Sequence, residues 1–478
     1  MGKNRENQLP LSPSWPDHRL ARELESISKI LDQNPSISDL VLHDLCDKVS
    51  SQNGARGMTA EQVLRCALIK QTHQLSYQKL AFHLADSQSF RIFCRLPYGF
   101  TPSQSTLQEN ISRIEASTWQ ALNRVLVRWA DEKGLEKGRR IRVDATGVES
   151  NIRYPLDSQL LYDSIRVVTR LLKRLNPSES LSFVDHSRGA KRRCLNIRNS
   201  RGEKRKKHYR DLLKIARRTL GYGTRALEQA PQWQDPISPV LAEGLVHHLD
   251  LMGRVIQQTQ RRVILGQKIP ATEKMVSIFE EHTDIIEKGA RESLFGHKLY
   301  LSVGKSSLIL DAVLMKGNPA DSQQLEPLLE RQCDLYGRYP RQASFDGGFA
   351  SSDNLKWAKN QGVQDVAFAK KCGLTIENMV RSSWVYKQLR RFRAGIEGCI
   401  STAKRVFGLT RCLWKGWSHF QRYVHLSVLS YNLVVLARLL VSLLLVSLLP
   451  VCSLPHAILQ GEVSAERAFA EPQRPEQR

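Results

Sequence analysis

The sequence lacks paired cysteines and lacks an apolar segment near its N-terminus. Its nine cysteines are scattered singly over 478 residues, with no Cys-x2-Cys pair. Structural zinc sites and disulfide scaffolds draw on closely spaced cysteines, and secreted proteins begin with an apolar signal segment. These absences argue against a zinc domain and a secreted fold, and we expect buried free thiols in a reducing cytoplasm.

Long uncharged apolar runs are also scarce. The richest stretch, residues 433–451, is interrupted by Arg438, which leaves Leu439–Leu449 as its longest leucine-rich piece. A piece of that length rises only about 16 Å as a helix, half the thickness of a bilayer core. We predict a buried C-terminal helix here, with a membrane anchor as the alternative, and a disordered polar tail after Pro450.

Acidic residues are few relative to basic ones. The chain has 71 Lys and Arg against 47 Asp and Glu, a net charge of +24. So large a surplus repels itself in a compact chain, so it is usually retained because a polyanion neutralises it. Nucleic acid is the commonest such partner, although ribosomal and membrane-surface proteins share this balance.

The basic residues concentrate in one stretch. Residues 188–218 carry 14 Lys or Arg, against only Glu203 and Asp211. We predict that the densest part, Lys204, Arg205, Lys206 and Lys207, binds DNA phosphates. A solvated helix face is the alternative.

Periodicity divides the chain into a helical front and a strand-rich body with a helical insertion. Thr59, Ser76 and either Ser103 or Ser105 are expected helix caps, the last opening one helix that continues to about Ala130. We expect the front to bind DNA through a helix-turn-helix, with a plain bundle as the alternative. The expected parts are a front at 1–135, a catalytic body at 136–157 and 266–440, a basic insertion at 158–265, and an apolar helix with tail at 441–478.

The body alternates strands and helices. Ile141 and Val143 alternate with Arg142 and Asp144, which predicts a strand that ends near residues 146–147. Further strands are expected at 297–303 and 308–314, before Asp346, and in 363–370. Helices are expected after a cap at Ser351 or Ser352 and across 394–407. This order predicts a mixed α/β layer fold.

The tetrapeptide Gly-Lys-Ser-Ser at 304–307 invites comparison with a phosphate-binding loop. The first glycine of that motif would fall at position 299, which is Leu, and the piece joins two strands instead of preceding a helix. An ATPase is therefore not expected.

Three acids are placed where metal chemistry needs them. Phosphodiester cleavage is catalysed by two Mg²⁺ ions that carboxylates hold near the DNA backbone. Asp144 and Asp346 both lie at the exit of an expected strand, and glycines within three residues after each leave room for a substrate. Each could instead be a turn residue. Because clustered acids repel one another, at least one should have a raised pKa without metal.

Glu397 lies on an expected helix with cations on its own face. Arg393 is one turn earlier, and Ser401 and Lys404 follow four and seven residues later. Such a face combines a metal ligand with two cations that can pair with phosphates. A solvated helix face is the alternative.

These segments resemble bacterial insertion-sequence DDE transposases of the ISNCY type. The stretches that carry the resemblance are VDATGVESNIRYPLDSQLLYDSIRVVTRLL, EEHTDIIEKG with GHKLYLSVGKSSLILDAVLMKGNPADS, QASFDGGFASSDNLKWAKNQGVQDVAFAK, and LRRFRAGIEGCISTAKRVFGLTRCLWKGW. The front from Thr59 to about Ile114 also looks like the N-terminal domain of such enzymes.

The resemblance implies an RNase H-like catalytic fold with Asp144, Asp346 and Glu397 as catalytic residues and ligands of two Mg²⁺ or Mn²⁺ ions. It implies nicking of double-stranded DNA at terminal inverted repeats, then attack of the freed 3′-OH on target DNA. A homodimer or larger synaptic complex in the bacterial cytoplasm, at the nucleoid when DNA-bound, is expected from that function. Related enzymes often show Tyr-x2-Arg-x3-Glu-x6-Lys around the last acid. Arg393, Glu397 and Lys404 fit it, whereas Arg390 replaces the Tyr.

Other functions remain open at the level of sequence. An RNase H-like nuclease without strand transfer needs the same acids, and an inactive DNA-binding relic of a transposase needs none of them. A tyrosine recombinase would use Tyr423 with nearby His419, Arg422 and His425. Phe420, Val424 and Val428 are spaced as a core stripe around that tyrosine, which favours a packing role.

Overall fold

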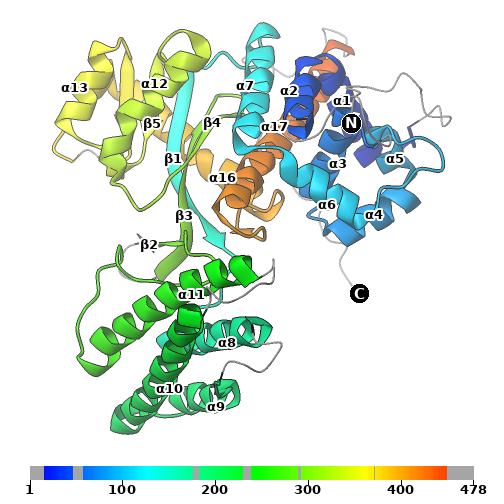
Figure 1. Ribbon diagram of the computed structural model, residues 1–478. Coiled ribbons are helices and arrows are strands. Elements are labelled where there is room, and N and C mark those ends of the chain that lie inside the picture. Colours follow the sequence, from blue (N-terminus) through cyan, green and yellow to red (C-terminus); the bar gives the residue numbers. More distant parts are fainter. Residues whose placement is uncertain are drawn as a thin grey trace, which may run out of the picture. The chain divides into compact units, whose positions relative to one another are not determined.

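The computed structural model describes residues 15–46, 57–175, 182–229, 238–288, 292–370 and 372–448 (Figure 1). The chain forms two compact units. The composite unit joins residues up to Glu149 with those from Lys298 onward, and the inserted unit is Ser150–His297. The tail expected after Pro450 lies outside the described residues.

The front of the composite unit is helical. Thr59 caps α3 through a capping box with Gln62, and Ser76 and Ser103 cap α4 and α6 through side-chain hydrogen bonds, as the sequence predicted. The front helices are α1 (Arg19–Asp32), α2 (Ser36–Cys46), α3 (Ala60–Thr72), α4 (Tyr77–Asp86), α5 (Gln88–Cys94), α6 (Gln104–Arg113) and α7 (Ala116–Glu132).

The single helix predicted from Ser103 to about Ala130 is wrong. The backbone is extended at Ile114 and Glu115, which separates α6 from α7. Ile114 is fully buried at the break. Tertiary burial of this side chain sets the break, and no glycine or proline marks it in the sequence.

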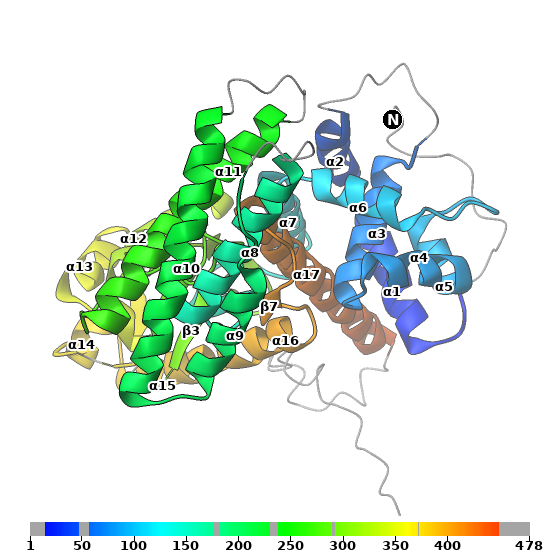
Figure 2. The ribbon, with the colours of Figure 1, turned by 60° about the horizontal axis from the view of Figure 1, so that its bottom comes forward.

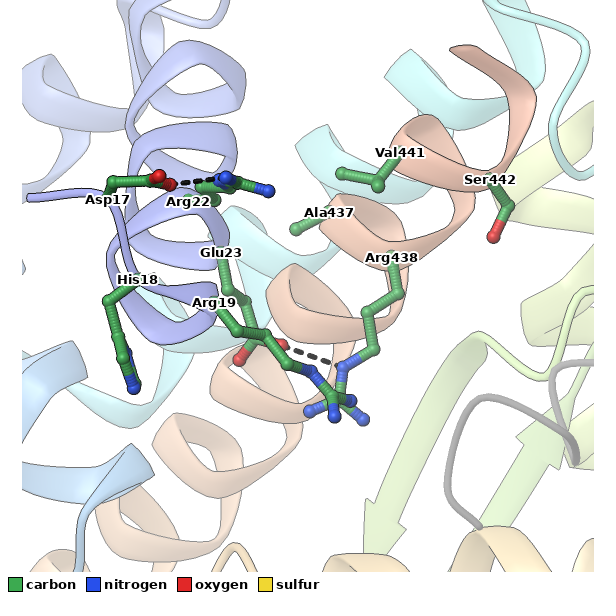
Figure 3. Close-up of a pocket in the computed structure, with 9 residues that line it drawn as sticks. All are labelled: Asp17, His18, Arg19, Arg22, Glu23, Ala437, Arg438, Val441 and Ser442. Atoms are coloured by element: carbon green, nitrogen blue, oxygen red, sulfur yellow. Dashed lines mark hydrogen bonds and ion pairs between the residues drawn. The ribbon is translucent and has the colours of Figure 1, made fainter. Parts of the chain in front are cut away.

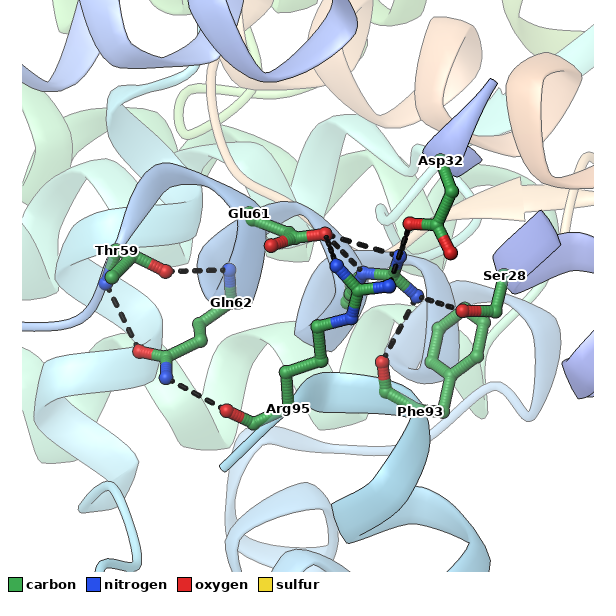
Figure 4. A network of polar contacts seen from close by, with 8 residues as sticks. Ser28, Asp32, Thr59, Glu61, Gln62, Phe93 and Arg95 are labelled. Atoms are coloured by element: carbon green, nitrogen blue, oxygen red, sulfur yellow. Dashed lines mark hydrogen bonds and ion pairs between the residues drawn. The ribbon is translucent and has the colours of Figure 1, made fainter. Parts of the chain in front are cut away.

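A buried ion network joins three front helices (Figure 4). Arg65 of α3 is fully buried and lies 3.0 Å from Asp32 of α1 and 3.1 Å from Glu61 of α3. Arg95, which follows α5, lies 2.6 Å from each of the same two carboxylates. Because a buried charge is tolerated only when it is paired, this network specifies how α1, α3 and α5 pack.

A seven-stranded mixed sheet forms the body. The strands are β1 (Arg140–Ser150), β2 (Asp284–Lys288), β3 (Glu292–Val303), β4 (Ile309–Leu314), β5 (Gln342–Phe345), β6 (Asp365–Phe368) and β7 (Arg411–Cys412). The strand order is β2-β3-β1-β5-β6, with β4 on β3 and β7 on β1. The β1–β5 and β5–β6 pairs are parallel, and the pairs of β3 with β2 and β4 are antiparallel. The mixed α/β class expected from the sequence is confirmed.

The predicted end of β1 near residues 146–147 is wrong. The strand continues through Gly147 to Ser150, and Glu149 donates its N–H to the Thr410 carbonyl beside β7 at 3.0 Å. Pairing with β5 nevertheless stops at Val143. A strand ends where its hydrogen-bond partners end, and β7 arrives from a distant part of the sequence.

Helices after β4 complete the composite unit. They are α12 (Leu325–Tyr336), α13 (Ser352–Asn360, capped by Ser351), α14 (Ile376–Met379), α15 (Ser383–Ala394), α16 (Ile396–Arg405) and α17 (Trp417–Leu448). Figure 1 shows α17 alongside α7, and it also packs against α1 and α3. Its segment Trp417–Leu443 is apolar and long enough to cross a membrane, but 67% of the 18-residue apolar window within this segment is buried inside the structure.

The Gly-Lys-Ser-Ser turn binds a carboxylate of the chain itself. Ser306 donates its backbone N–H and its hydroxyl to Glu136 Oε2, at 2.8 and 2.6 Å. A side chain on Gly304 would collide with the same oxygen, since a Cβ there would lie 2.3 Å from it. The turn therefore fixes the chain ahead of β1, in agreement with the rejection of a nucleotide-binding loop.

His425 of α17 makes the stability of the composite unit sensitive to acid. Full burial lowers its pKa to about 4 from 6.5, and its Nε2 lies 2.8 Å from Gln120 Nε2. The folded state disfavours the protonated ring, so its stability should be complete above pH 6.5 and fall as the pH drops from 6.5 to 4. The shift corresponds to about 3 kcal/mol. Thermal unfolding midpoints should drop less over this range in His425→Gln, and equal drops in both proteins would contradict the assignment.

The inserted unit is a helical bundle (Figure 2). It contains α8 (Asp157–Leu175), α9 (Ser187–Arg198), α10 (Gly202–Gln229) and α11 (Ser238–Thr259), then a π-helical turn (Gln260–Ile264). Helix α8 packs against α9, α10 and α11 around a core of its own. The helices expected within 158–265 are therefore present.

Candidate active site

Two of the three expected acids lie side by side because of strand register. The parallel ladder pairs Arg142 with Ser344 and Val143 with Phe345. Asp144 is the next residue of β1 and Asp346 directly follows the end of β5, and adjacent strands are about 4.8 Å apart. The two carboxylates therefore project near the same end of the β1–β5 pair.

The third acid begins a separate helix. The sequence predicted one helix carrying both Arg393 and Glu397, but Arg393 lies in the last turn of α15 and Glu397 in the first turn of α16, with Gly395 between the two helices. That prediction was wrong in its boundary. The i,i+4 contact is kept, since Arg393 Nη1 lies 3.9 Å from Glu397 Oε1.

One guanidinium contacts all three acids. Arg393 Nη2 lies 2.9 Å from Asp144 Oδ2 and 3.1 Å from Asp346 Oδ1, besides the longer contact to Glu397. The exposed fractions of the acid side chains differ: 15% for Asp144, 45% for Asp346 and 74% for Glu397. The site therefore has a buried side at β1 and an open side at α16.

Asp144 carries the raised pKa that the sequence led us to expect. Burial is the largest cause, and the carboxylates of Asp346 and Glu397 raise the pKa further. The Arg393 guanidinium and the Ala145 N–H, which donates to Asp144 Oδ1 at 2.8 Å, act in the opposite direction. Repulsion between acids thus contributes, but removal from water contributes more.

The glycines after Asp346 serve packing inside the chain. A Cβ on Gly347 would lie 2.9 Å from the side chain of Lys370, and one on Gly348 would lie 2.5 Å from Asp321 Oδ2. Neither glycine has a positive φ. The open space that the sequence argument assigned to them is filled in this structure by Lys370 and Asp321.

Sequence reasoning missed Arg142 as a positioning residue. It is buried, donates to the Phe392 carbonyl at 2.8 Å and to Ser307 Oγ at 3.0 Å, and lies over the Phe392 ring. These contacts hold the end of α15, and with it Arg393, against β1. Its place beside Asp144 in the strand alternation was the available signal.

A second acid next to the site was also missed. Asp321, which contacts Gly348, accepts a hydrogen bond from the Tyr300 hydroxyl at 2.8 Å and lies 2.5 Å from Lys298 Nζ. Nothing in the local sequence pattern marks it, because its partners come from β3.

The remaining predicted residues belong to different helices. Lys404 is in the last turn of α16, two turns beyond Glu397, and Arg390 is exposed on α15. Lys204, Arg205, Lys206 and Lys207 lie in the first two turns of α10, in the inserted unit. The rejected tyrosine nucleophile is buried, and its hydroxyl donates to the Gly408 carbonyl at 2.9 Å.

The oxygen atoms of the three carboxylates are suitable ligands for a hard divalent cation. Carboxylate oxygens are the preferred ligands of Mg²⁺ and Mn²⁺. In the described residues, no three His, Cys, Asp or Glu side chains are grouped closely enough to hold one ion as they stand. The guanidinium of Arg393 provides the positive charge between the carboxylates in this structure. The three acids are therefore the right kind of ligand for a metal ion, but their side chains must rearrange before they can bind the same ion.

A cavity of about 460 Å³ lies away from the acids, between α1 and the end of α17 (Figure 3). Its charged lining is largely paired: Arg438 Nε lies 2.8 Å from Glu23, and Arg22 pairs with Asp17. None of the three acids lines it. This cavity is therefore not part of the candidate active site.

Two stretches of the chain match known families. Residues 279–433 match the Transposase DDE domain, and residues 14–113 match the Transposase domain (DUF772). Comparisons with curated proteins and with solved structures gave no match. The DDE stretch contains Asp346 and Glu397. Asp144 lies in the part of the sequence between the two matched stretches.

A DDE domain preceded by this second domain defines the transposase class of DNA-processing proteins. The pairing is typical of transposases encoded by bacterial insertion sequences, and the chain belongs to that family. The family is one of nuclease and transferase enzymes that act on DNA and generally use divalent metal ions.

Proposed function

We propose that the chain cleaves DNA at the ends of an insertion sequence of the ISNCY type and joins the freed 3′-OH to target DNA. Asp144, Asp346 and Glu397 are its catalytic carboxylates. The observation that carries the proposal is their convergence on Arg393, at 2.9, 3.1 and 3.9 Å, from three separate elements. Carboxylates this close repel one another, which lowers the stability of the metal-free chain. Bound metal ions would offset this repulsion, so a metal site explains why the acids are placed together.

These carboxylates would hold two Mg²⁺ or Mn²⁺ ions, which activate the attacking oxygen and stabilise the leaving oxygen. Asp144 is oriented by the Ala145 N–H, so only its other oxygen faces Arg393. Asp346 and Glu397 are the more exposed pair. The DNA backbone therefore reaches the site from the side of α16.

The proposed organisation follows from the same elements. The catalytic domain, 136–157 with 266–440, is RNase H-like, which the parallel β1–β5–β6 core flanked by antiparallel β3 and β4 supports. Residues 1–135 are the helical DNA-binding front, 158–265 the basic insertion and 441–478 the C-terminal extension. Two ends must be joined, so we place the enzyme in a homodimer or larger synaptic complex on double-stranded DNA, in the bacterial cytoplasm.

Five cations are proposed to bind DNA phosphates beside the acids or on the insertion: Lys404 near the active site, and Lys204, Arg205, Lys206 and Lys207 on α10. Arg393, also predicted to bind phosphate, pairs with the acids in this structure. It becomes available to phosphate only when those acids acquire another counter-charge.

A nuclease that cuts without joining would use the same acids, and it remains the second candidate. Products separate the two functions, since strand transfer attaches the element end to target DNA and hydrolysis alone does not. An inactive relic predicts neither product.

Metal removal tests the proposal. Incubation of the chain with terminal-repeat DNA and Mg²⁺ should give 3′-OH nicks and joined products, and EDTA should stop both while DNA binding persists. Added Mg²⁺ should also raise the unfolding temperature, because it relieves repulsion among the acids. Cleavage that continues in EDTA would exclude these carboxylates as metal ligands.

A further inference from the structure

The inserted unit contains a helix whose exposed face is cationic and free of acids. Helix α9, Ser187–Arg198, has five Lys or Arg residues and no Asp or Glu. Ala190, Cys194 and Ile197 are buried at spacings of four and three residues, which fixes the rotation of the helix. Arg188, Lys191, Arg192 and Leu195 share the opposite, exposed face.

The cations of this face have no counter-charge among the residues that the structure describes. Arg188, Lys191 and Arg192 form no ion pair with any residue in the described part of the chain. The two acids that flank the helix in sequence are engaged elsewhere. Asp185 lies 2.6 Å from Lys173 and accepts the Ser187 N–H, and Glu203 lies 3.0 Å from Lys206.

The cation-rich face of α10 is different. Glu203 lies 3.0 Å from Lys206 and 3.9 Å from Arg210, so part of its charge is already neutralised. On α9, by contrast, Arg188 meets Lys191 and Arg192 at i+3 and i+4, spacings at which like charges destabilise a helix. A bound polyanion removes this repulsion.

Leu195 indicates the kind of polyanion. It is 55% exposed at the C-terminal end of the cationic face, one turn after Lys191 and Arg192. A free phosphate offers nothing to such a side chain, whereas a DNA groove presents sugars and thymine methyl groups beside its phosphates. An α-helix such as α9, about 10–12 Å across with its side chains, also fits the major groove, which is about 12 Å wide.

We propose that the Arg188–Lys191–Arg192–Leu195 face of α9 docks on duplex DNA, with the three cations on phosphates and Leu195 against the groove. The inference rests on the proposed function for its DNA substrate. It assigns a DNA contact to residues other than the three acids and the cations of α10.

The test uses the full chain carrying Asp346→Asn, so that binding is measured without cutting. In this background the triple variant Arg188→Gln, Lys191→Gln, Arg192→Gln should lower the slope of log K against log salt by about 2 to 3, since each lost phosphate contact contributes about 0.9. The matched control is Arg166→Gln, Arg170→Gln, Arg174→Gln on α8, three exposed cations of the same unit. It should change the slope by less than 1.

Each result of this experiment either supports or overturns the proposal. An unchanged slope in the α9 triple, or equal changes in the two triples, overturns the proposal, because net charge alone would then account for binding. Helical content and unfolding temperature of the α9 triple should be equal to or above those of the parent. Absence of nicking by the unaltered chain would instead refute the proposed function.

Discussion

Replacement of Asp346 by Asn is expected to reduce strand cleavage by about three orders of magnitude or more while DNA binding remains. The carboxamide preserves the shape of the side chain and removes the negative charge that a metal ligand provides. Loss of several kcal/mol of transition-state stabilisation at a metal centre corresponds to a factor of this size. Nicking of labelled terminal-repeat duplexes measures it, with binding followed in parallel by anisotropy.

Asp353 provides a matched control for this substitution. It is an exposed aspartate in the first turn of α13, seven residues further along the chain. Asp353→Asn makes the same chemical change and should leave cleavage within about twofold, since a surface substitution of this kind has little effect. If Asp346→Asn still nicks at the parent rate, the active site lies elsewhere.

Replacement of Arg393 by Gln is expected to destabilise the metal-free chain strongly. Its guanidinium is 16% exposed and lies within 3.1 Å of two carboxylates and 3.9 Å of a third. Without it, three acids face one another with no counter-charge. Breaking a buried ion pair costs about 3–5 kcal/mol, and the exposure of Asp346 and Glu397 reduces this to about 2–4 kcal/mol.

Calorimetry with and without metal distinguishes this role from simple packing. The unfolding midpoint of Arg393→Gln should fall by several degrees in EDTA, and Mn²⁺ should restore much of the loss, because the ion replaces the missing positive charge. Arg391→Gln, an exposed neighbour on α15, should show neither effect. Identical melting of the two variants, with or without Mn²⁺, would show that Arg393 does not balance the acids.

Local structure in the front could be predicted because its causes are local. Thr59, Ser76 and Ser103 cap helices through contacts within three residues, so the signal and the structure share one short segment. The break at Ile114 could not be predicted in this way, because it follows from burial of that side chain in the composite unit.

The two aspartates show where sequence reasoning stops. Alternation placed Asp144 on a strand and Gly347–Gly348 placed Asp346 after one, but no local feature states that the two strands are neighbours. The β1–β5 register does so. The same holds for Arg142 and Asp321, whose partners lie on segments far away in the chain.

The contacts of Arg393 with the acids could not be predicted from the sequence for the same reason. Its spacing from Glu397 indicated a phosphate-binding cation on a shared helix, whereas the chain breaks at Gly395 and the guanidinium turns to three carboxylates. The spacing of residues in the sequence predicts which side chains share a helix face. Only the packed structure shows which residues that face contacts.

The sequence by itself determined the composition of the site: an acid on one strand and another just after a second strand, cations near the last acid, and a basic insertion in a strongly positive chain. These are properties of residue type and short spacing, which the chain carries before it folds. The tertiary structure decided which acids meet, that Arg393 joins them, and which helix of the insertion presents unpaired charge. Those outcomes depend on strand register and on the burial of Ala190, Cys194 and Ile197, and such long-range contacts form only when the whole unit packs.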